Sequence, residues 1–236
     1  MGILYIVSTP IGNLQDIGIR AIKILTEVRY IACEDTRKTG FLLGKIRDIY
    51  SKLHPDNQIQ ERPYLISYFE QNEEKRIPEI VNILKNGADV ALVSDAGTPT
   101  ISDPGFKLVR ECIREGIKVT SIPGPSSVIS SLVVSGLATD KFLFAGYPPK
   151  KQGHRKSFFT KLKKSKKELK FTLIIFESPH KLLRTLSELK DIFGDIEIAL
   201  ARELTKVFEE IKRDKLSNLI GYFEKKTPKG EFVILL

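Results

Sequence analysis

Residues 91–105 read ALVSDAGTPTISDPG, an apolar run that passes directly into a loop rich in Gly, Pro, Ser and Asp. The segment Val90 to Val93 is typical of a strand buried on both faces of a parallel sheet. Asp103 and Pro104 then predict the N-cap and the first residue of a helix. The loop therefore opens beyond the carboxyl end of a strand, where open α/β sheets bind ligands. An ordinary strand-to-helix turn is the alternative if this stretch is taken alone.

Two further strands end in loops of the same kind. The apolar run Ile3 to Val7 enters the loop STPIGNLQD, residues 8–16, and Val119 to Ile122 enters PGPSS, residues 123–127. Each loop is a weak signal by itself. Because the carboxyl ends of parallel strands share one edge of a sheet, we expect the three loops to converge on one ligand site.

Length and composition predict a globular chain with a large core. The chain has 236 residues, of which 42% are hydrophobic, and no run approaches the roughly 20 apolar residues of a spanning helix. The N-terminus runs straight into a strand without a signal-peptide pattern, so we expect a cytoplasmic protein with no membrane segment. Cys33 and Cys112 are isolated and are expected to be core thiols in a reducing compartment. Only three histidines occur, none at ligand spacing, which argues against a transition-metal site.

The positive charge of the chain is concentrated in one segment. Residues 150–170 hold ten Lys or Arg against one acid, a local balance of +9 that equals the net charge of the whole protein. Phe158, Phe159 and Leu162 would anchor one side of a helix here, leaving the lysines on the other side. Such a patch suits a polyanion, and nucleic acid is the natural candidate, because neutralised phosphates would supply most of the affinity. A solvated lysine-rich helix without a ligand is the alternative.

The order of predicted elements indicates a mostly parallel α/β sheet in the first half and more strand character in the second. Strands are expected near residues 3–7, 30–33, 65–68, 90–93, 119–122, 142–144, 171–176, 196–201, 207–211 and 231–236. Helices are expected near residues 16–26, 77–84, 179–189 and 215–223, with Ser178 and Pro179 as N-cap and first helical residue. Residues 47–63 are polar and are expected to form an irregular surface loop.

A domain boundary is expected at Pro123-Gly124-Pro125, since two prolines around a glycine continue neither a helix nor a strand. The sequence thus predicts an N-terminal α/β domain, residues 1–122, and a C-terminal α/β domain, residues 123–236. The third loop would then lie between the domains.

The common nucleotide signatures are absent from the sequence. Gly40 and Gly44-Lys45 have the wrong spacing for a P-loop, and Ile46 stands where a Mg²⁺-binding hydroxyl belongs. No G-x-G-x-x-G follows the first strand, which argues against a dinucleotide site. The three loops hold few basic residues, which favours a ligand bound by hydrogen bonds and packing rather than through phosphates.

Eight short motifs together resemble the tetrapyrrole methylase family, and within it the branch that methylates ribosomal RNA. They are LYIVSTPIGNL (4–14), EDTR (34–37), SDAGTP (94–99), SDPG (102–105), IPGPS (122–126), ESPH (177–180), ARELTK (201–206) and KGE (229–231). The motifs cover nearly the whole chain. Residues 8–13 read STPIGN, where the tetrapyrrole-methylating members have a glycine-rich loop, and this departure favours an RNA substrate.

The resemblance implies a two-domain class III methyltransferase that holds S-adenosylmethionine in a cleft between the domains. It implies methylation of the ribose 2′-hydroxyl of a cytidine in the decoding region of small-subunit rRNA, by a homodimer. Two other readings stay open: methylation of a precorrin-like tetrapyrrole, and a non-catalytic RNA-binding assembly protein. The sequence leaves open whether free rRNA or the 30S subunit is the substrate.

The resemblance also assigns site residues. The implied cofactor contacts are Pro10, Asp95, Ala96, Gly97, Thr98, Ser126, Ser127, Phe176, Ala201 and Gly230.

A ribose hydroxyl is a poor nucleophile at neutral pH, so a group that accepts its proton or lowers its pKa would assist the transfer. The candidates for this catalytic part are Glu177, His180 and Lys206. The candidates for RNA binding are Arg37, Lys163, Lys164, Lys166, Lys167 and Arg202. Residues 34–37 read equally well as a hydrogen-bonded turn and as a substrate-positioning segment, and capping or ion pairing is the alternative for His180 and Arg202.

Overall fold

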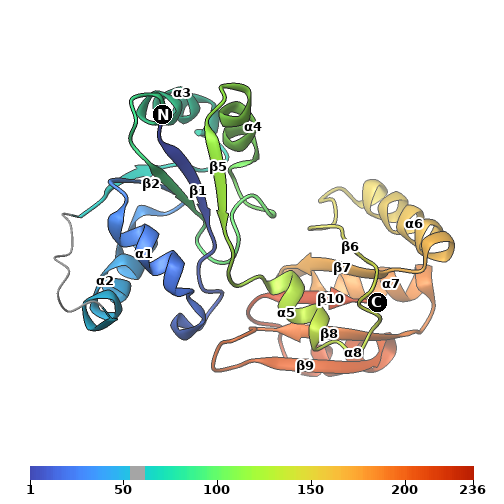
Figure 1. The fold of residues 1–236 in the computed structure, drawn as a ribbon. Coiled ribbons are helices and arrows are strands. Elements are labelled where there is room, and N and C mark those ends of the chain that lie inside the picture. Colours follow the sequence, from blue (N-terminus) through green and yellow to red (C-terminus); the bar gives the residue numbers. More distant parts are fainter. Residues whose placement is uncertain (54–61) are drawn as a thin grey trace. The chain divides into compact units, whose positions relative to one another are not determined.

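A computed structural model describes residues 1–53 and 62–236, and it divides the chain into two compact units, Met1–Ser126 and Ser127–Leu236. Figure 1 shows the course of the chain through each unit. The segment Pro123–Pro125 packs with the first unit, because Gly124 lies against Ser8 and the Pro125 carbonyl accepts a hydrogen bond from Thr98.

Unit 1 is a five-stranded parallel sheet in the order β3-β2-β4-β1-β5. Its strands are β1 (Ile3–Val7), β2 (Tyr30–Cys33), β3 (Tyr64–Ser67), β4 (Val90–Val93) and β5 (Lys118–Ile122). Its helices are the short 3₁₀ helix η1 (Leu14–Asp16), α1 (Ile19–Glu27), α2 (Thr36–Leu53), α3 (Glu73–Lys85) and α4 (Phe106–Arg114). The predicted strands 30–33 and 90–93 are confirmed to the residue.

Helices cover both faces of this sheet, which explains why its inner strands β2, β4 and β1 are mostly apolar. Val7, Ile31 and Val93 pack on the side of α1 and α2. Leu4 and Leu92, whose side chains point the other way, pack on the side of α3 and α4. Figure 1 shows the two helix pairs on opposite sides of the strands.

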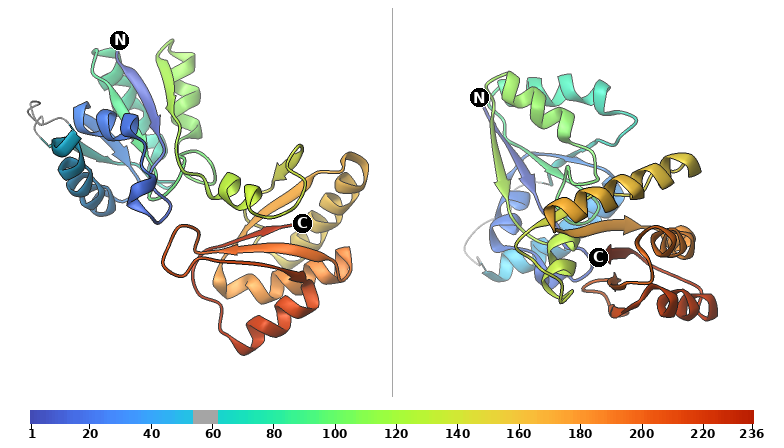
Figure 2. Two further views of the ribbon diagram at one scale, coloured as in Figure 1. Left: turned by 60° about the horizontal axis from the view of Figure 1, so that its bottom comes forward. Right: turned by 90° about the vertical axis from the view of Figure 1, so that its right-hand side faces the viewer.

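Unit 2 is a mixed five-stranded sheet in the order β6-β7-β10-β8-β9, parallel only between β6 and β7. Its strands are β6 (Phe142–Phe144), β7 (Thr172–Glu177), β8 (Glu197–Arg202), β9 (Glu210–Lys215) and β10 (Phe232–Leu235). Its helices are α5 (Ser127–Val133), α6 (Gln152–Leu169), the 3₁₀ helix η2 (Pro179–Lys181), α7 (Leu182–Phe193) and α8 (Leu216–Lys225). Helices α7 and α8 lie side by side on one face of the sheet (Figure 2), and Leu186 and Leu219 join the core there.

Three predictions about elements are wrong. Residues 47–53 are not a loop: α2 continues to its end at residue 53 because Leu43, Ile46 and Tyr50 bury one face of it. The remainder of that predicted loop, residues 54–61, lies outside the described residues. The chain turns over residues 100–105, so α4 begins only at Phe106, with Gly105 rather than Asp103 at its N-cap. The strand predicted at 207–211 is β9, which begins at Glu210 after a turn.

Candidate functional site

The carboxyl ends of β4, β1 and β5 are neighbours, because β1 lies between the other two strands. Their loops touch. The backbone of Thr9 exchanges two hydrogen bonds with Gly97, N to O 2.8 Å and O to N 3.1 Å. The Thr98 hydroxyl lies 2.9 Å from the Ser8 hydroxyl and donates to the Pro125 carbonyl at 3.2 Å. The predicted convergence of the three loops is therefore confirmed within unit 1.

Two glycines permit this close contact. Gly97 has φ +82°, and a Cβ added there would lie 3.3 Å from the Ile11 side chain. At Gly124 a Cβ would lie 2.9 Å from the Cβ of Ser8. The loops are thus built so that backbone approaches backbone, with short hydroxyl side chains between them.

The acidic turn after β2 is tied to the β4 loop. Asp95 accepts hydrogen bonds from the Asp35 amide at 3.2 Å and from Lys38 Nζ at 2.6 Å. The Arg37 guanidinium, an exposed group, binds the Asp35 carboxylate at 2.9 Å and lowers the pKa of Asp35 to about 2. Hydrogen bonding to Asp95 raises the pKa of Lys38. Residues 34 and 35 connect β2 to α2, whose first turn includes Thr36 and Arg37. Hydrogen bonds therefore fix this segment, while the Arg37 side chain stays exposed.

Two further carboxyl groups lie beside this network. Burial raises the pKa of Asp103 to about 6, and the charges of Glu34 and Asp95 add to that rise while the Ser94 hydroxyl opposes it. Burial also raises the pKa of Glu34, with Asp95 as the next cause. Both carboxyl groups are therefore harder to ionise than free side chains.

A cavity of about 850 Å³ opens at the same sheet edge, a size typical of small-molecule sites. Three stretches line it: the β1 loop, the first half of α2 and the start of the β4 loop. The lining residues are Thr9, Pro10, Gly12, Leu14, Asp35, Arg37, Lys38, Thr39, Phe41, Leu42, Lys45, Ser94 and Asp95. Of the predicted cofactor contacts, Pro10 and Asp95 lie in this wall, and Ala96, Gly97 and Thr98 continue the loop beside it.

Other predicted cofactor residues lie at the end of unit 1 and in unit 2. Ser126 is the last residue of unit 1 and Ser127 the first of α5. Phe176 and Ala201 both pair with Val233, so the three form one row across β7, β10 and β8. Gly230 has φ +93°, and a Cβ there would lie 2.5 Å from the Glu203 side chain.

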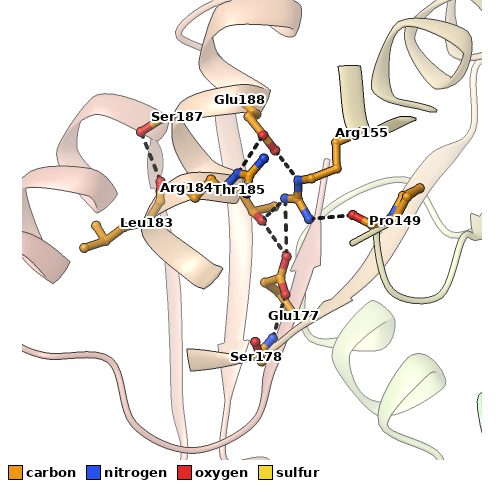
Figure 3. Close-up of polar contacts among 9 residues, drawn as sticks. All are labelled: Pro149, Arg155, Glu177, Ser178, Leu183, Arg184, Thr185, Ser187 and Glu188. Carbon is orange, nitrogen blue, oxygen red and sulfur yellow. Dashed lines mark hydrogen bonds and ion pairs between the residues drawn. The ribbon is translucent and has the colours of Figure 1, made fainter. Parts of the chain in front are cut away.

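Glu177, a predicted catalytic residue, is buried inside unit 2. Figure 3 shows its carboxylate beside Thr185 and Arg155, with the Ser178 amide donating to it from below. Arg155 lies 3.6 Å from Glu177, binds Glu188 at 2.7 Å and donates to Thr185 at 2.6 Å. Every oxygen of Glu177 has a partner from the protein, which indicates that it joins α6 and α7 to β7. Arg155 is 1% exposed, so its assignment to a basic surface patch is wrong.

Lys206 and His180, the other catalytic candidates, lie nearer the surface. Lys206 Nζ is 3.0 Å from both Glu203 and Glu231. Partial burial alone would lower the pKa of Lys206, but the hydrogen bonds to these two carboxylates outweigh it and raise the pKa. Lys206 is therefore a cation at neutral pH rather than a base. His180 is exposed on η2, and Arg202 donates to the Lys229 carbonyl at 2.7 Å and pairs with Glu210.

The lysines predicted to bind RNA on α6 fall into two pairs. Lys163 donates to the Ile192 carbonyl near the end of α7, and Lys166 donates to the Phe171 carbonyl at 2.6 Å. Burial lowers the pKa of Lys166. Lys164 and Lys167 point to solvent, whereas Phe159 and Leu162 bury the opposite side of α6 as predicted. Only the second lysine pair is available to an external ligand.

No sequence motif marks Phe41 and Lys45 in the α2 wall of the cavity. Their exposure depends on how α2 packs on the sheet. A helical reading of Leu42, Leu43 and Ile46 would have placed Phe41 at the edge of the apolar face.

Within residues 1–53 and 62–236, no helix is long and apolar enough to cross a membrane. The same residues contain no cluster of His, Cys, Asp or Glu suited to a metal ion.

Comparison with known proteins gives consistent matches over nearly the whole chain. The model of the Tetrapyrrole (Corrin/Porphyrin) Methylases matches residues 3–220. A protein from Thermotoga maritima named Ribosomal RNA small subunit methyltransferase I is 48% identical over 236 residues, 100% of this chain and 98% of that one. A protein of the same name from Hydrogenobaculum is 44% identical over 234 residues, 99% of this chain and 94% of that one.

Solved structures match at lower identity. A cobalt precorrin-4 methyltransferase has a TM-score of 0.69 at 16% identity, covering 99% of this chain and 94% of that one. Uroporphyrin-III C-methyltransferase from Thermus thermophilus, complexed with S-adenyl homocysteine, has a TM-score of 0.63 at 18% identity, covering 99% and 97%. These likenesses confirm the predicted α/β fold of the class III methyltransferases.

Proposed function

Because the chain belongs to the tetrapyrrole methylase family, we propose that it transfers the methyl group of S-adenosylmethionine to small-subunit ribosomal RNA. The observation that carries this proposal is the 48% identity, over the whole chain, with a relative named for that activity. The acceptor we propose is the 2′-hydroxyl of a cytidine ribose in the decoding region, as the motifs imply.

The converging loops of unit 1 suit such a donor. S-adenosylmethionine offers an adenine ring, ribose hydroxyls, an amino group and a carboxylate for hydrogen bonding and no phosphate. These loops offer backbone groups and hydroxyls. Gly97 lets the β4 loop approach the β1 loop closely, next to the Thr98 hydroxyl. We assign Pro10 and Asp95 to Thr98 to one part of the donor site. We keep Ser126, Ser127, Phe176, Ala201 and Gly230 as proposed donor contacts, as the resemblance of the motifs implies.

Methyl transfer from S-adenosylmethionine requires little acid catalysis by the protein. The bound donor supplies an electrophilic methyl group on a positively charged sulfur, whose thioether leaves uncharged. The residues of the chain must hold the acceptor hydroxyl in line with that methyl, an alignment that contributes several kcal/mol, on the order of 7–11 at best. We assign Lys206, held protonated by Glu203 and Glu231, to stabilising the developing alkoxide. His180, which is exposed, is the candidate acceptor of the proton.

Glu177 takes a different part in this proposal. Its burial among Thr185, Arg155 and the Ser178 amide supports a positioning role, in which it fixes the end of β7 next to Phe176. The substrate would not touch its carboxylate.

For RNA binding we propose the exposed α6 lysines Lys164 and Lys167, together with Arg202 and Arg37. The acceptor is either free rRNA or the 30S subunit, since both present the same RNA phosphates to these cations. We also propose a cytoplasmic location, since ribosomes reside there. The homodimer is proposed because the resemblance implies it.

One assay tests the proposal. The protein is incubated with methyl-labelled S-adenosylmethionine and, in separate reactions, 30S subunits, naked rRNA or a precorrin-like macrocycle. Label in rRNA, in the 30S or the naked-rRNA reaction, recovered as a 2′-O-methylcytidine after digestion, is the expected result. Label in the macrocycle would assign tetrapyrrole methylation, and label in no acceptor would leave an RNA-binding assembly protein.

A further inference from the structure

The half of α2 that lines the unit 1 cavity carries a feature that no motif explains. Phe41 is 71% exposed, although it faces the cavity, and Lys45 Nζ lies 5.5 Å from its ring centroid. Arg37, Phe41 and Lys45 are one helical turn apart, so the three form a single stripe. An exposed phenylalanine flanked by two cations on one helix face is the pattern of a surface that stacks a base and holds its phosphates.

The surface around Phe41 is open on its helix. Gly40 and Gly44 lie beside it, and a Cβ added at either glycine would meet nothing within 4 Å. Glycine inside a helix costs roughly 0.5–1 kcal/mol relative to alanine, and no packing within the described chain requires it at these positions. The two glycines therefore leave a ring face accessible without a side chain beside it.

In the wall of the cavity itself, three cations stand against two carboxylates. The cations are Arg37, Lys38 and Lys45, and the carboxylates are Asp35 and Asp95. Lys38 is taken up by Asp95 at 2.6 Å, and Arg37 is held to Asp35 at 2.9 Å with its side chain 90% exposed. Lys45 packs over the Phe41 ring rather than against either carboxylate. Its charge is therefore available where the stripe borders the cavity.

We infer that the Arg37–Phe41–Lys45 stripe of α2 receives an unpaired nucleotide of the RNA substrate, with its base stacked on Phe41 and its phosphates next to Arg37 and Lys45. The inference rests on the proposed function and deepens it, since the opposite wall of the same cavity is formed by Pro10, Ser94 and Asp95, on the donor side. A flipped-out nucleotide held on α2 would thus enter the cavity that the donor loops border. Recognition by stacking is typical of single-stranded RNA.

Substitution of the ring is the first test. Phe41→Ala should raise KM for 30S subunits about tenfold or more, since base–aromatic stacking contributes that much, and should leave the affinity for S-adenosylmethionine unchanged by calorimetry. The matched control is Phe106→Ala, because Phe106 is 64% exposed, has Arg110 at 5.6 Å from its ring and lies on α4 of the same unit. This control should change neither quantity.

A second variant reports binding without activity. The chain contains no tryptophan, so Phe41→Trp introduces a single tryptophan at the stripe, which is excited selectively over the tyrosines at long wavelength. A cytidine-containing single-stranded oligoribonucleotide should quench it, and Lys45→Gln added to this variant should weaken that binding and reduce its salt dependence by about one ion.

The outcomes separate the two proposals. Quenching by RNA with no methylation of any RNA would refute the proposed function and leave the stripe as an RNA site. Methylation of 30S rRNA together with an unchanged KM for Phe41→Ala, or the absence of quenching, would overturn the inference. Weakened donor binding by Phe41→Ala would overturn it too, since the stripe would then belong to the donor.

Discussion

Asp95 connects the β4 loop, which we propose binds the donor, to the α2 wall of the cavity. Its carboxylate holds the Asp35 amide and Lys38, at the start of α2, while its backbone belongs to the β4 loop. Asp95→Ala should therefore reduce affinity for S-adenosylmethionine about tenfold or more, the effect of one or two charge-assisted hydrogen bonds, and leave the fold intact.

Asp95→Asn is the matched variant, because it keeps an acceptor for the Asp35 amide and removes the ion pair with Lys38. It should lie between wild type and Asp95→Ala. Donor affinity unchanged in Asp95→Ala, measured by calorimetry, would remove this residue from the donor site.

Asp103 makes stability depend on pH. Its pKa is about 6 in the folded protein, raised by burial first and then by Glu34 and Asp95, against 3.8 for the free side chain. The folded state therefore binds more protons than the unfolded state between these values, and the free energy of unfolding should fall as the pH rises through 6. Asp103→Asn should flatten this dependence and raise stability at pH 8 by roughly 1 kcal/mol, allowing for partial solvent screening.

Urea unfolding at pH 5 and pH 8 measures the effect of Asp103→Asn. The same stability difference between the two pH values in the variant and in wild type would show that another group causes the dependence.

At the scale of elements, α6 serves both packing and the surface. Lys164→Gln with Lys167→Gln should lower RNA affinity and reduce the slope of log K against log salt by up to about two ions. Lys163→Gln with Lys166→Gln changes the same charge but removes donors to the Ile192 and Phe171 carbonyls. That pair should lower the free energy of unfolding by about 1–3 kcal/mol and alter the salt slope less. An equal salt slope for the two double variants would refute the division of these lysines into RNA-binding and packing pairs.

The contact of α6 and α7 with β7 depends on a buried ion network. Glu177→Ala leaves the Arg155 guanidinium with one carboxylate fewer in an apolar surrounding, which should cost about 3–5 kcal/mol of stability. Replacing Arg155 by Met and Glu177 by Leu together should recover much of this loss. Thermal unfolding of the two variants and of wild type measures the effect. A Glu177→Ala protein of normal stability with a collapsed kcat would return Glu177 to the catalytic residues.

Predicted elements agree with the structure where the local sequence pattern alone determines the element. The strands at 30–33 and 90–93 are uniform apolar runs, and buried parallel strands leave that mark in sequence. Element ends were less predictable. The final turns of α2 look polar because one face alone is buried, and the start of α4 was displaced by positive φ values at Thr100 and Ser102 that no propensity reveals.

At the scale of the whole molecule, side-chain roles depended on partners distant in sequence. In the sequence, Arg155 is one of ten cations in a single segment. In the structure, it is buried and pairs with Glu177 of β7 and Glu188 of α7. Lys163 is likewise taken up by a carbonyl 29 residues away. The converging loops could be predicted, since parallel strands bring their carboxyl ends to one edge, but which lysines remain free required tertiary structure.

The central claim is that the loops after β1, β4 and β5 hold the methyl donor. A crystal of the protein soaked with S-adenosylhomocysteine tests it most directly. The account predicts density for the ligand against Pro10 and the backbone of residues 95–98, in contact with the Pro123–Ser126 loop. Density at a site that touches none of these three loops would contradict it.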